Sequence, residues 1–368
     1  MAYRYLGNKA RIADWIGSIV AERLPPGTSI ADPMCGTATM SATFAEHGLR
    51  VIASDELRFP TLHARARLLH DGTAFGSRLE YGRAIEVLNA LAPERGFFWR
   101  EYSDEGKPQN GCKPRMYFTG HNAARIDAIR RKLREWRESG VADDDIDLLL
   151  HDLILAVNRV ANIAGTYGYY RSSWNPASLA PLWIAPSEPS RYRYKHEVMQ
   201  GRVEDLSART EAAAVYLDPP YTKRQYGGNY HILETIAQED EPDPVGDGGL
   251  RDWYPQASDF CYRRRAKAAF ETTMSNVKSD WVFISYSEDG HISGTELMSL
   301  LEKYGSVKRL HTPIERFRSN ARVAKSGAVH EHLYIVETSS NARTDGDRRT
   351  LVAKAQSKRS VQHRTINC

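Results

Sequence analysis

Residues 29–55 read SIADPMCGTATMSATFAEHGLRVIASD, and this stretch decides the fold. A short apolar run ends on Asp32 and a turn of small residues follows. A helical segment then extends to Gly48, before a second apolar run ends on Asp55. Strand, turn, helix and strand in such close order are typical of a β-α-β unit with two parallel strands. The chain is therefore expected to have an α/β fold built on a mostly parallel sheet.

The same alternation returns in the second half of the chain. Apolar runs predict four more strands, at residues 212–218, 281–287, 306–312 and 330–338. The last two have no helix between them, so we expect them to pair antiparallel and to place one antiparallel strand near an edge of the sheet. Helical spacing between the other strands predicts helices on both faces of the sheet.

Residues 58–200 lose this alternation and show helical spacing, so we expect a mostly helical inserted domain there. Residues 1–57 and 201–338 then form the domain that contains the sheet. Residues 339–368 are polar and basic with few apolar side chains, which predicts a disordered tail. Such a tail either adds salt-sensitive attraction to nucleic acid or only keeps the protein soluble, and its residues fit both uses.

The bulk composition is that of an ordinary globular protein. Of 368 residues, 41% are apolar and 26% are charged, and no apolar run approaches the ~20 residues that cross a bilayer. The four cysteines lie far apart and form no metal-binding or disulfide pattern. The N-terminus shows no signal-peptide pattern. We expect a cytoplasmic monomer without a bound metal or a membrane segment.

Three of the predicted strands end in an aspartate: Asp32, Asp55 and Asp218. Ligands of open α/β sheets bind outside the carboxyl ends of the strands, so these acids should share one crevice. The turn after Asp32 has one glycine, Gly36, where pyrophosphate-binding turns have several. A nucleoside without phosphates needs a single close backbone approach, and Asp55 is placed to accept hydrogen bonds from ribose hydroxyls. A structural strand–helix turn fits these residues equally well.

The strongest signal is the tetrapeptide Asp218-Pro219-Pro220-Tyr221 at the end of a predicted strand. Proline fixes φ and restricts the residue before it, so the segment is stiff. It offers a carboxylate, a backbone carbonyl and an aromatic ring close together. This set suits an exocyclic amine on a planar base, because the two acceptors take both N–H groups while the base stacks on Tyr221. A Pro-Pro turn that only caps a strand is the alternative.

These motifs together resemble the alpha group of N6-adenine-specific DNA methyltransferases, the D12 class that includes Dam-like enzymes. Residues 5–9 (YLGNK) resemble its leading motif, and residues 31–45 resemble its cofactor turn, with Ala38 where glycine is commoner. Three further segments are very similar to a restriction-associated subgroup: residues 157–170, 218–236 and 329–337. The order of the motifs, with a long insertion before the tetrapeptide, is that of the alpha group.

The resemblance implies a Rossmann-like methyltransferase fold that binds S-adenosylmethionine, whose adenosine carries no phosphates. It also implies site-specific methylation of adenine N6 in double-stranded DNA, linked to restriction-modification with a cognate restriction endonuclease. The cofactor-binding residues that it implies are Tyr5, Gly7, Lys9, Asp32, Gly36, Asp55, Val203, Glu204 and Asp218. Lys9 would meet the methionine carboxylate. Val203 and Glu204 would lie beside the cofactor adenine, although Arg202 stands where the family more often has aspartate.

The catalytic residues implied by the resemblance are Asp218, Pro219, Pro220 and Tyr221. Adenine N6 is a poor nucleophile because its lone pair is delocalised into the ring. If Asp218 and the Pro219 carbonyl accept both N–H groups, the nitrogen becomes pyramidal and the methyl transfers by in-line displacement. No covalent intermediate is needed, so Cys35 is interpreted as a packing residue. The adenine must be flipped out of the duplex to reach this segment.

Basic and polar residues in three segments are the predicted DNA contacts. They are Lys223, Arg224, Asn229, Arg171, Arg316, Arg318, Arg322 and Lys325. We expect residues 222–229 to form a flexible loop that closes on DNA about Gly227 and Gly228. The inserted domain is the expected place for reading the target sequence. Its residues 167–174 either contact DNA or pack the insertion onto the core, and residues 315–327 either contact DNA or form a solvated loop.

Several other functions fit part of these observations. An N4-cytosine methyltransferase uses the same geometry, usually with serine in place of Asp218, and an RNA adenine methyltransferase shares the chemistry but not the motif order. A catalytically dead DNA-binding protein on the same scaffold is opposed by the retained Lys9, Asp55, Asp218 and Tyr221. A nicotinamide oxidoreductase would need a phosphate-binding loop, which this chain lacks.

Overall fold

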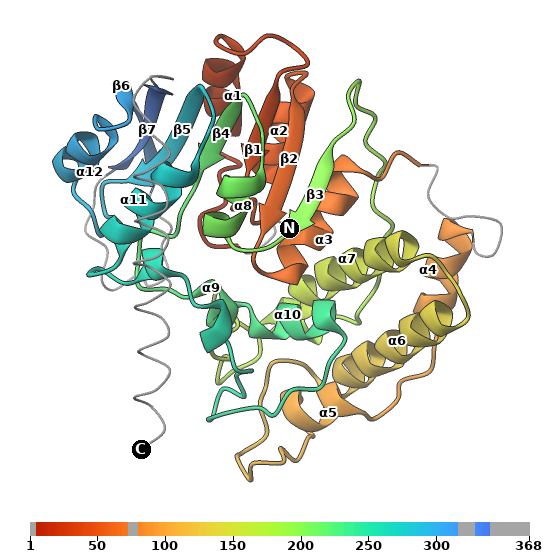
Figure 1. Cartoon of the computed structure of the whole chain (residues 1–368). Helices are drawn as coiled ribbons and strands as arrows, with labels where there is room; N and C mark the ends of the chain where they lie inside the picture. The colour runs from red at the N-terminus through yellow and green to blue at the C-terminus, as the bar shows by residue number, and fades with distance from the viewer. Residues whose placement is uncertain (1–4, 73–79, 316–327, 339–368) are drawn as a thin grey trace.

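A seven-stranded sheet forms the centre of the structure (Figure 1). The computed structural model describes residues 5–72, 80–315 and 328–338, so the tail at 339–368 lies outside the described residues. The strands are β1 (Ser29–Asp32), β2 (Arg50–Asp55), β3 (Glu197–Gln200), β4 (Ala214–Leu217), β5 (Trp281–Ser287), β6 (Gly305–Glu315) and β7 (Ala328–Thr338). Their order is β3-β2-β1-β4-β5-β7-β6, and among these strands β7 runs antiparallel to both of its neighbours. The other pairs are parallel, which confirms the predicted α/β sheet.

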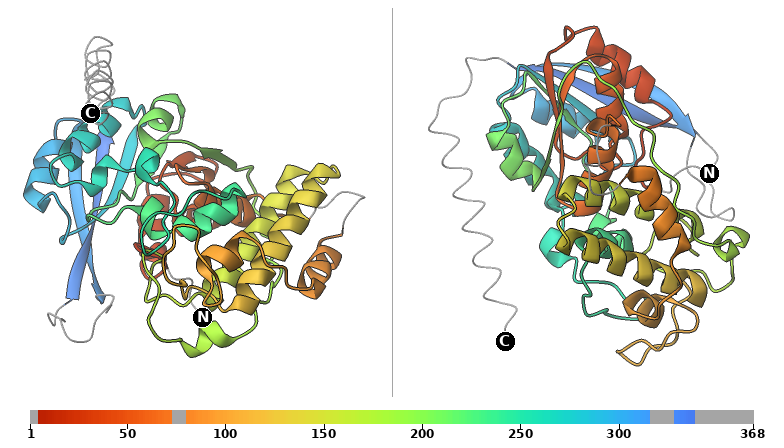
Figure 2. Two further views of the ribbon diagram at one scale, coloured as in Figure 1. Left: turned by 90° about the horizontal axis from the view of Figure 1, so that it is seen from below. Right: turned by 90° about the vertical axis from the view of Figure 1, so that its right-hand side faces the viewer.

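Helices cover both faces of the sheet, as predicted (Figure 2). One face carries α1 (Ala13–Ala21), α2 (Thr39–Glu46) and α3 (Arg58–Leu68), and the other carries α8 (Val203–Arg209), α11 (Ala266–Asn276) and α12 (Gly294–Leu301). The side chains of the central strands alternate between two hydrophobic cores. Tyr216 and Phe283 face the first helices, whereas Val215 and Ile284 face the second. This Rossmann-like arrangement brings the carboxyl ends of the parallel strands to one edge.

A third core, built mainly from helices, lies below the sheet in Figure 1. Its helices are α4 (Tyr81–Ala90), α5 (Phe97–Tyr102), α6 (Gly120–Glu138), α7 (Asp143–Val160) and α10 (His231–Gln238). Short helices complete the described chain: α9 (Tyr226–Asn229), η1 (Pro176–Leu179), η2 (Tyr254–Gln256) and η3 (Asp259–Cys261). Two features were not predicted. Strand β3 falls within residues 58–200 yet forms an edge of the sheet, and α10 lies outside that range yet packs into the helical core.

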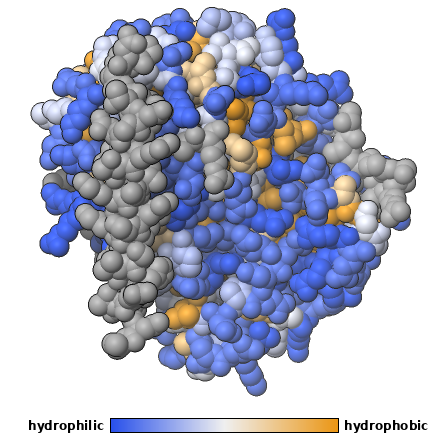
Figure 3. Space-filling model, in the orientation of Figure 1, coloured by the Kyte–Doolittle hydropathy of each residue, from blue (hydrophilic) through white to orange (hydrophobic). Residues whose placement is uncertain are grey.

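The face of the molecule drawn in Figure 3 is mostly hydrophilic. Within the described ranges, no helix combines the length and the apolar character needed to span a membrane. The large apolar side chains that are exposed include Tyr169 and Tyr254. Each stacks on its chain neighbour, with ring centroids 4.6 Å apart for Tyr170 and 4.4 Å apart for Trp253. Exposed ring pairs of this kind can meet another planar group without rearrangement.

One buried carboxylate joins the sheet to the helical core. Glu234 on α10 is fully buried, and its two oxygens accept hydrogen bonds from the backbone N–H groups of Arg58 and Phe59, both at 3.0 Å. These groups open α3, whose own N-cap residue, Leu57, makes no side-chain cap. Because α3 follows β2 and α10 follows the tetrapeptide at 218–221, this contact fixes two predicted motifs relative to each other.

Replacement of Glu234 by glutamine should weaken the hydrogen bonds between α10 and the start of α3. The amide keeps the size of the side chain but loses one acceptor and the charge that strengthens both hydrogen bonds. We expect Glu234→Gln to lower the free energy of unfolding, measured in urea, by about 1.5–3 kcal/mol. The matched control is Glu86→Gln on α4, whose side chain is 67% exposed. Its effect should stay within about 0.5 kcal/mol, and equal effects of the two changes would contradict the role given to Glu234.

Candidate active site

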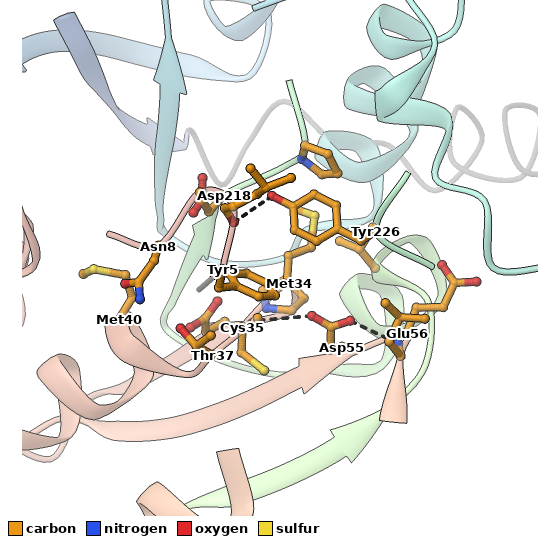
Figure 4. A pocket seen from close by; sticks show the side chains of 18 of the residues that line it. Tyr5, Asn8, Met34, Cys35, Thr37, Met40, Asp55, Glu56, Asp218 and Tyr226 are labelled. Atoms are coloured by element: carbon orange, nitrogen blue, oxygen red, sulfur yellow. Dashed lines mark hydrogen bonds between the residues drawn. The ribbon is translucent and has the colours of Figure 1, made fainter. Parts of the chain in front are cut away.

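A pocket opens at the carboxyl ends of β1, β2 and β4, and all three aspartates line it. Figure 4 shows Asp55 and Asp218 in this pocket. Its empty volume is about 890 Å³, a figure that includes space open to solvent. Eight residues expected to bind the cofactor line it: Tyr5, Gly7, Lys9, Asp32, Gly36, Asp55, Val203 and Asp218. Glu204, the ninth, lies outside the lining, and its carboxylate is 3.6 Å from Nε of Arg202.

Asp55 is tied to the turn after β1. Its Oδ2 accepts a hydrogen bond from the Gly36 N–H at 3.1 Å, and its Oδ1 accepts one from the Leu57 N–H, also at 3.1 Å. Gly36 has a φ of 53°, and a Cβ there would lie 3.0 Å from the Tyr5 ring, so both the backbone conformation and the close contact favour glycine. Burial raises the pKa of Asp55 to about 7, although the backbone hydrogen bonds oppose this rise. The carboxylate holds the turn and keeps further lone pairs for a ligand hydroxyl.

Asp32 carries an acceptor without a partner. The Ser41 hydroxyl donates to its Oδ2 at 2.6 Å, whereas its Oδ1 is buried and accepts no hydrogen bond. Burial is the main cause that raises the pKa of this carboxyl group to about 7. An unpaired buried acceptor costs about 1–3 kcal/mol, so a ligand that donates a hydrogen bond here gains affinity. An amine or hydroxyl group of S-adenosylmethionine would satisfy this oxygen, and the pocket therefore fits that cofactor.

Two tyrosines that follow the tetrapeptide hold the N-terminal motif in place. The Leu6 N–H donates to the Tyr230 hydroxyl at 2.6 Å, and the Tyr226 hydroxyl donates to the Leu6 carbonyl at 3.1 Å. The Tyr5 ring also stacks on the Tyr230 ring, with centroids 4.9 Å apart. Sequence analysis singled out neither tyrosine of this pair, although their spacing of four residues is typical of side chains that act together. The N-terminal motif at residues 5–9 is thus bound to the segment that follows the tetrapeptide.

Lys9 is buried between two carboxylates. Its Nζ is 2.8 Å from Asp218 Oδ1 and 3.2 Å from Glu331 Oε1. Burial lowers the pKa of Lys9, but the two carboxylates outweigh burial and hold this pKa well above its ordinary value. Burial raises the pKa of Asp218 to about 6, against the opposing effect of Lys9. The resemblance implied a contact between Lys9 and the cofactor carboxylate, whereas the structure pairs Lys9 with two carboxylates of the chain itself.

Glu331 on β7 and Ser285 on β5 complete this charge cluster. The Ser285 hydroxyl donates to Glu331 Oε1 at 2.7 Å, and both side chains are buried. Sequence analysis singled out neither residue. The signal for Glu331 is the period of two along β7, which places it on one face with Leu333 and Ile335. A charge on an otherwise apolar strand face needs a partner, so this pattern indicates a buried ion pair.

The tetrapeptide leads from β4 into the pocket. Two of its residues, Asp218 and Pro220, line the pocket wall. The Tyr221 ring lies beside this wall, edge-on to the Tyr286 ring, with centroids 5.7 Å apart. Lys9 Nζ lies 5.6 Å from the centroid of the Tyr221 ring, within range of a cation–π contact. The aromatic ring and the carboxylate of the tetrapeptide therefore share one cation.

The predicted DNA-binding residues fall into two groups. Lys223, Arg224, Asn229 and Arg171 lie within the described ranges, and Arg316, Arg318, Arg322 and Lys325 lie outside them. The three basic side chains of the first group are exposed, whereas Asn229 is half-buried and donates to a carbonyl of its own helix. The Asn229 carbonyl accepts a hydrogen bond from the Tyr167 N–H at 2.7 Å, which brings residues 167–174 beside α9. In that segment Tyr167 is buried and Tyr169 is exposed.

Residues 226–229 form the short helix α9, in place of the flexible loop expected from the sequence. Both glycines of this helix, Gly227 and Gly228, are buried against Trp253. A Cβ at these positions would lie 3.1 Å and 3.2 Å from the Trp253 side chain. The glycines are therefore explained by the close approach of the indole ring, and the expected hinge is replaced by tight packing.

Comparison with known proteins identifies the family to which the chain belongs. The model of the D12 class N6 adenine-specific DNA methyltransferase family matches residues 5–300. Type II methyltransferase M.NlaIII of Neisseria lactamica is 28% identical over 342 residues, which are 90% of this chain and 98% of that protein. M.CviAII of Paramecium bursaria Chlorella virus 1 is 29% identical over 341 residues, 90% of this chain and 97% of that protein. M.FokI of Planomicrobium okeanokoites is 28% identical over 91% of this chain, which spans 52% of that longer protein.

Titration of Asp55 should couple cofactor binding to pH. Burial places its pKa at about 7 in the protein alone, and a hydroxyl donor favours the ionised carboxylate. S-adenosylmethionine should therefore bind more tightly as the pH rises through about 7, and its binding should release protons at slightly acidic pH. Calorimetry in two buffers with different ionisation enthalpies measures the number of protons released.

The matched variant for this measurement is Asp55→Asn, because the amide keeps the size of the side chain but does not titrate. It should release fewer protons and bind the cofactor roughly ten- to a hundred-fold more weakly. Any release that remains is assigned to Asp32, whose pKa is also about 7. Equal proton release by the wild type and Asp55→Asn would contradict the placement of a hydroxyl donor at Asp55.

Proposed function

The chain belongs to the D12 class N6 adenine-specific DNA methyltransferase family, and from that premise we propose how its own residues carry out the reaction. The enzyme methylates adenine N6 at specific sites in DNA, and S-adenosylmethionine supplies the electrophilic methyl group when it is bound. The observation that carries the proposal is the position of Asp218. Its side chain lines the pocket and is 18% exposed, while its Oδ1 lies 2.8 Å from Lys9 Nζ. Asp218 Oδ2 is thereby left for the substrate.

Asp218 Oδ2 and the Pro219 carbonyl accept hydrogen bonds from the two N–H groups of the adenine amine. This withdraws the nitrogen lone pair from the ring and directs it along the line of methyl transfer. The step needs preorganised acceptors more than a strong base. Burial holds the pKa of the Cys35 thiol in the pocket wall well above its ordinary value. The absence of a thiolate there supports direct displacement over a cysteine-bound intermediate.

The target adenine reaches Asp218 by leaving the duplex. Its ring then stacks on Tyr221, whose own ring is fixed by the contacts with Tyr286 and Lys9. Lys223 and Arg224 follow the tetrapeptide after one intervening residue and are exposed, which supports contact with phosphates beside the flipped base. Exposed groups of the inserted domain, Arg171 and Tyr169 among them, follow Tyr167, whose N–H donates to the Asn229 carbonyl of α9, and contact the DNA near the target.

The biological setting is the modification of double-stranded DNA at the recognition site of a cognate restriction endonuclease. The names of M.NlaIII and M.CviAII, both type II methyltransferases, support this setting. The enzyme acts on this DNA as a monomer. The inserted domain at residues 58–200 reads the target sequence, and Arg316, Arg318, Arg322 and Lys325 provide further DNA contacts.

Asp218→Ala tests the proposal directly. Loss of the carboxylate removes one acceptor for the amine, so single-turnover methylation should fall by at least about 100-fold. DNA binding should remain, because phosphate and groove contacts lie elsewhere. N6-methyladenine is measured by mass spectrometry, and DNA binding by fluorescence anisotropy. Asp243→Ala, at an exposed aspartate, is the matched control and should behave as wild type. Substantial methylation by Asp218→Ala would remove this residue from the adenine site.

Substitutions of Tyr221 should affect the reaction differently from substitution of Asp218. Stacking on an aromatic side chain contributes about 1–3 kcal/mol per base. Tyr221→Phe keeps the ring and should keep most of the activity, whereas Tyr221→Ala should lose the flipped state and most of the turnover. A fluorescent base analogue at the target position reports flipping in both variants. If Tyr221→Phe were as inactive as Tyr221→Ala, the hydroxyl and not the ring would matter, and the stacking role would be wrong.

A further inference from the structure

Glu331 is a buried carboxylate that contacts Lys9 from outside the pocket lining, and the reaction described above does not use it. Its side chain is 2% exposed, and its Oε1 lies 3.2 Å from Lys9 Nζ. The same oxygen accepts a hydrogen bond from the Ser285 hydroxyl at 2.7 Å, and Ser285 is fully buried on the neighbouring strand β5. Glu331 therefore belongs to a chain of contacts that runs from Ser285 through Glu331 and Lys9 to Asp218.

Stability alone is a poor reason for a carboxylate in this position. Removing a carboxylate from water costs several kcal/mol, and buried ion pairs often contribute less to stability than apolar side chains of similar size. The face of β7 that carries Glu331 otherwise packs Leu333 and Ile335 into an apolar core. An apolar residue would fit that face at lower cost. An apolar residue, however, could not form an ion pair with the Lys9 ammonium, which also contacts Asp218, the proposed adenine acceptor.

We propose that Glu331, fixed by Ser285, positions the Lys9 ammonium so that it occupies one oxygen of Asp218 and leaves the other to the adenine amine. Glu331 is a positioning residue, since it acts through Lys9 and touches no reacting atom. Glu331 also competes with Asp218 for the same ammonium. Asp218 is therefore a stronger hydrogen-bond acceptor than it would be if Lys9 paired with Asp218 alone. This inference rests on the role of Asp218 under the proposed function.

The charges around Asp218 determine the direction in which its pKa should change when Glu331 is replaced. Glu331 raises the pKa of Asp218, whereas Lys9 lowers it. Four other titratable groups interact with Asp218, and burial raises the pKa of each: Asp32, Tyr216, Tyr221 and Tyr226. The tyrosines stay neutral around pH 7, and Asp32 is unchanged by substitution at position 331. Removal of the Glu331 charge should therefore lower the pKa of Asp218 and tighten its pair with Lys9.

The experiment is the pH profile of single-turnover methylation with cofactor and DNA both saturating, so that titrations that affect only binding do not enter. Glu331→Gln should move the acid limb to lower pH by roughly half a unit or more. Its plateau rate should fall about tenfold, while cofactor affinity measured by calorimetry stays within about twofold of wild type. Glu331→Asp keeps the charge and should restore the limb toward its wild-type position.

The matched control is Glu337→Gln, the same chemical change on the same strand at an exposed side chain, and its profile should equal that of wild type. A Glu331→Gln profile that coincides with the Glu337→Gln profile overturns the inference. Ser285→Ala provides a second test if Glu331→Gln fails to fold. It keeps every charge and should lower the plateau rate without changing cofactor affinity, and a wild-type plateau overturns the inference equally.

Failure of the proposed function is recognised separately. The acid limb of the wild type should be absent from the residual activity of Asp218→Asn. If the limb persists in Asp218→Asn, Asp218 does not titrate in the reaction and the proposed role of Asp218 falls. If the limb disappears in Asp218→Asn but does not move in Glu331→Gln, the role of Asp218 stands and only the inference about Glu331 falls.

Discussion

One buried ammonium balances the acids at the carboxyl edge of the sheet. Parallel strands end at the same edge, so Asp32, Asp55 and Asp218 are brought together by the topology itself. Burial raises the pKa of each of them, which means that the folded chain holds these groups at a cost in free energy. Lys9 offsets part of that cost through its contacts with Asp218 and Glu331. The active site therefore depends on the docking of the N-terminal motif that carries Lys9.

That docking depends in turn on the segment after the tetrapeptide. Tyr230 binds the backbone of Leu6 across 224 positions of sequence, and Tyr226 binds the same residue from the preceding turn. A few residues later, Glu234 caps α3 and ties this segment to the end of β2. The cofactor turn, the N-terminal motif and the tetrapeptide thus form one unit. Much of the long insertion between them packs into a core that it shares with α10 and that Tyr5 and Leu6 also contact, so the insertion supports this unit from one side.

Sequence patterns predicted what depends on local order. The β-α-β unit followed from periodicity. Ala38, which stands where the family more often has glycine, adopts a φ of 55°, a conformation that glycine adopts at lower cost. Strand β3 escaped prediction because its four edge residues are only partly buried and form no apolar run. The glycines of α9 suggested a hinge because their partner, Trp253, is remote in sequence. The ion pair between Lys9 and Glu331 likewise could not be predicted, because no local sequence pattern links two residues so far apart in the chain.

Two carboxylates and one ammonium leave the centre of the site with an excess of one negative charge when all three groups are ionised. This excess suits a reaction whose methyl donor is a cation, whereas the raised pKa of Asp218 is mainly the result of burial. The excess also creates a difficulty, because the substrate is a polyanion. Lys223 and Arg224 have exposed side chains and follow the tetrapeptide after one intervening residue. If they contact phosphates beside the target base, as proposed, only the base itself, which is uncharged, has to approach the acidic pocket.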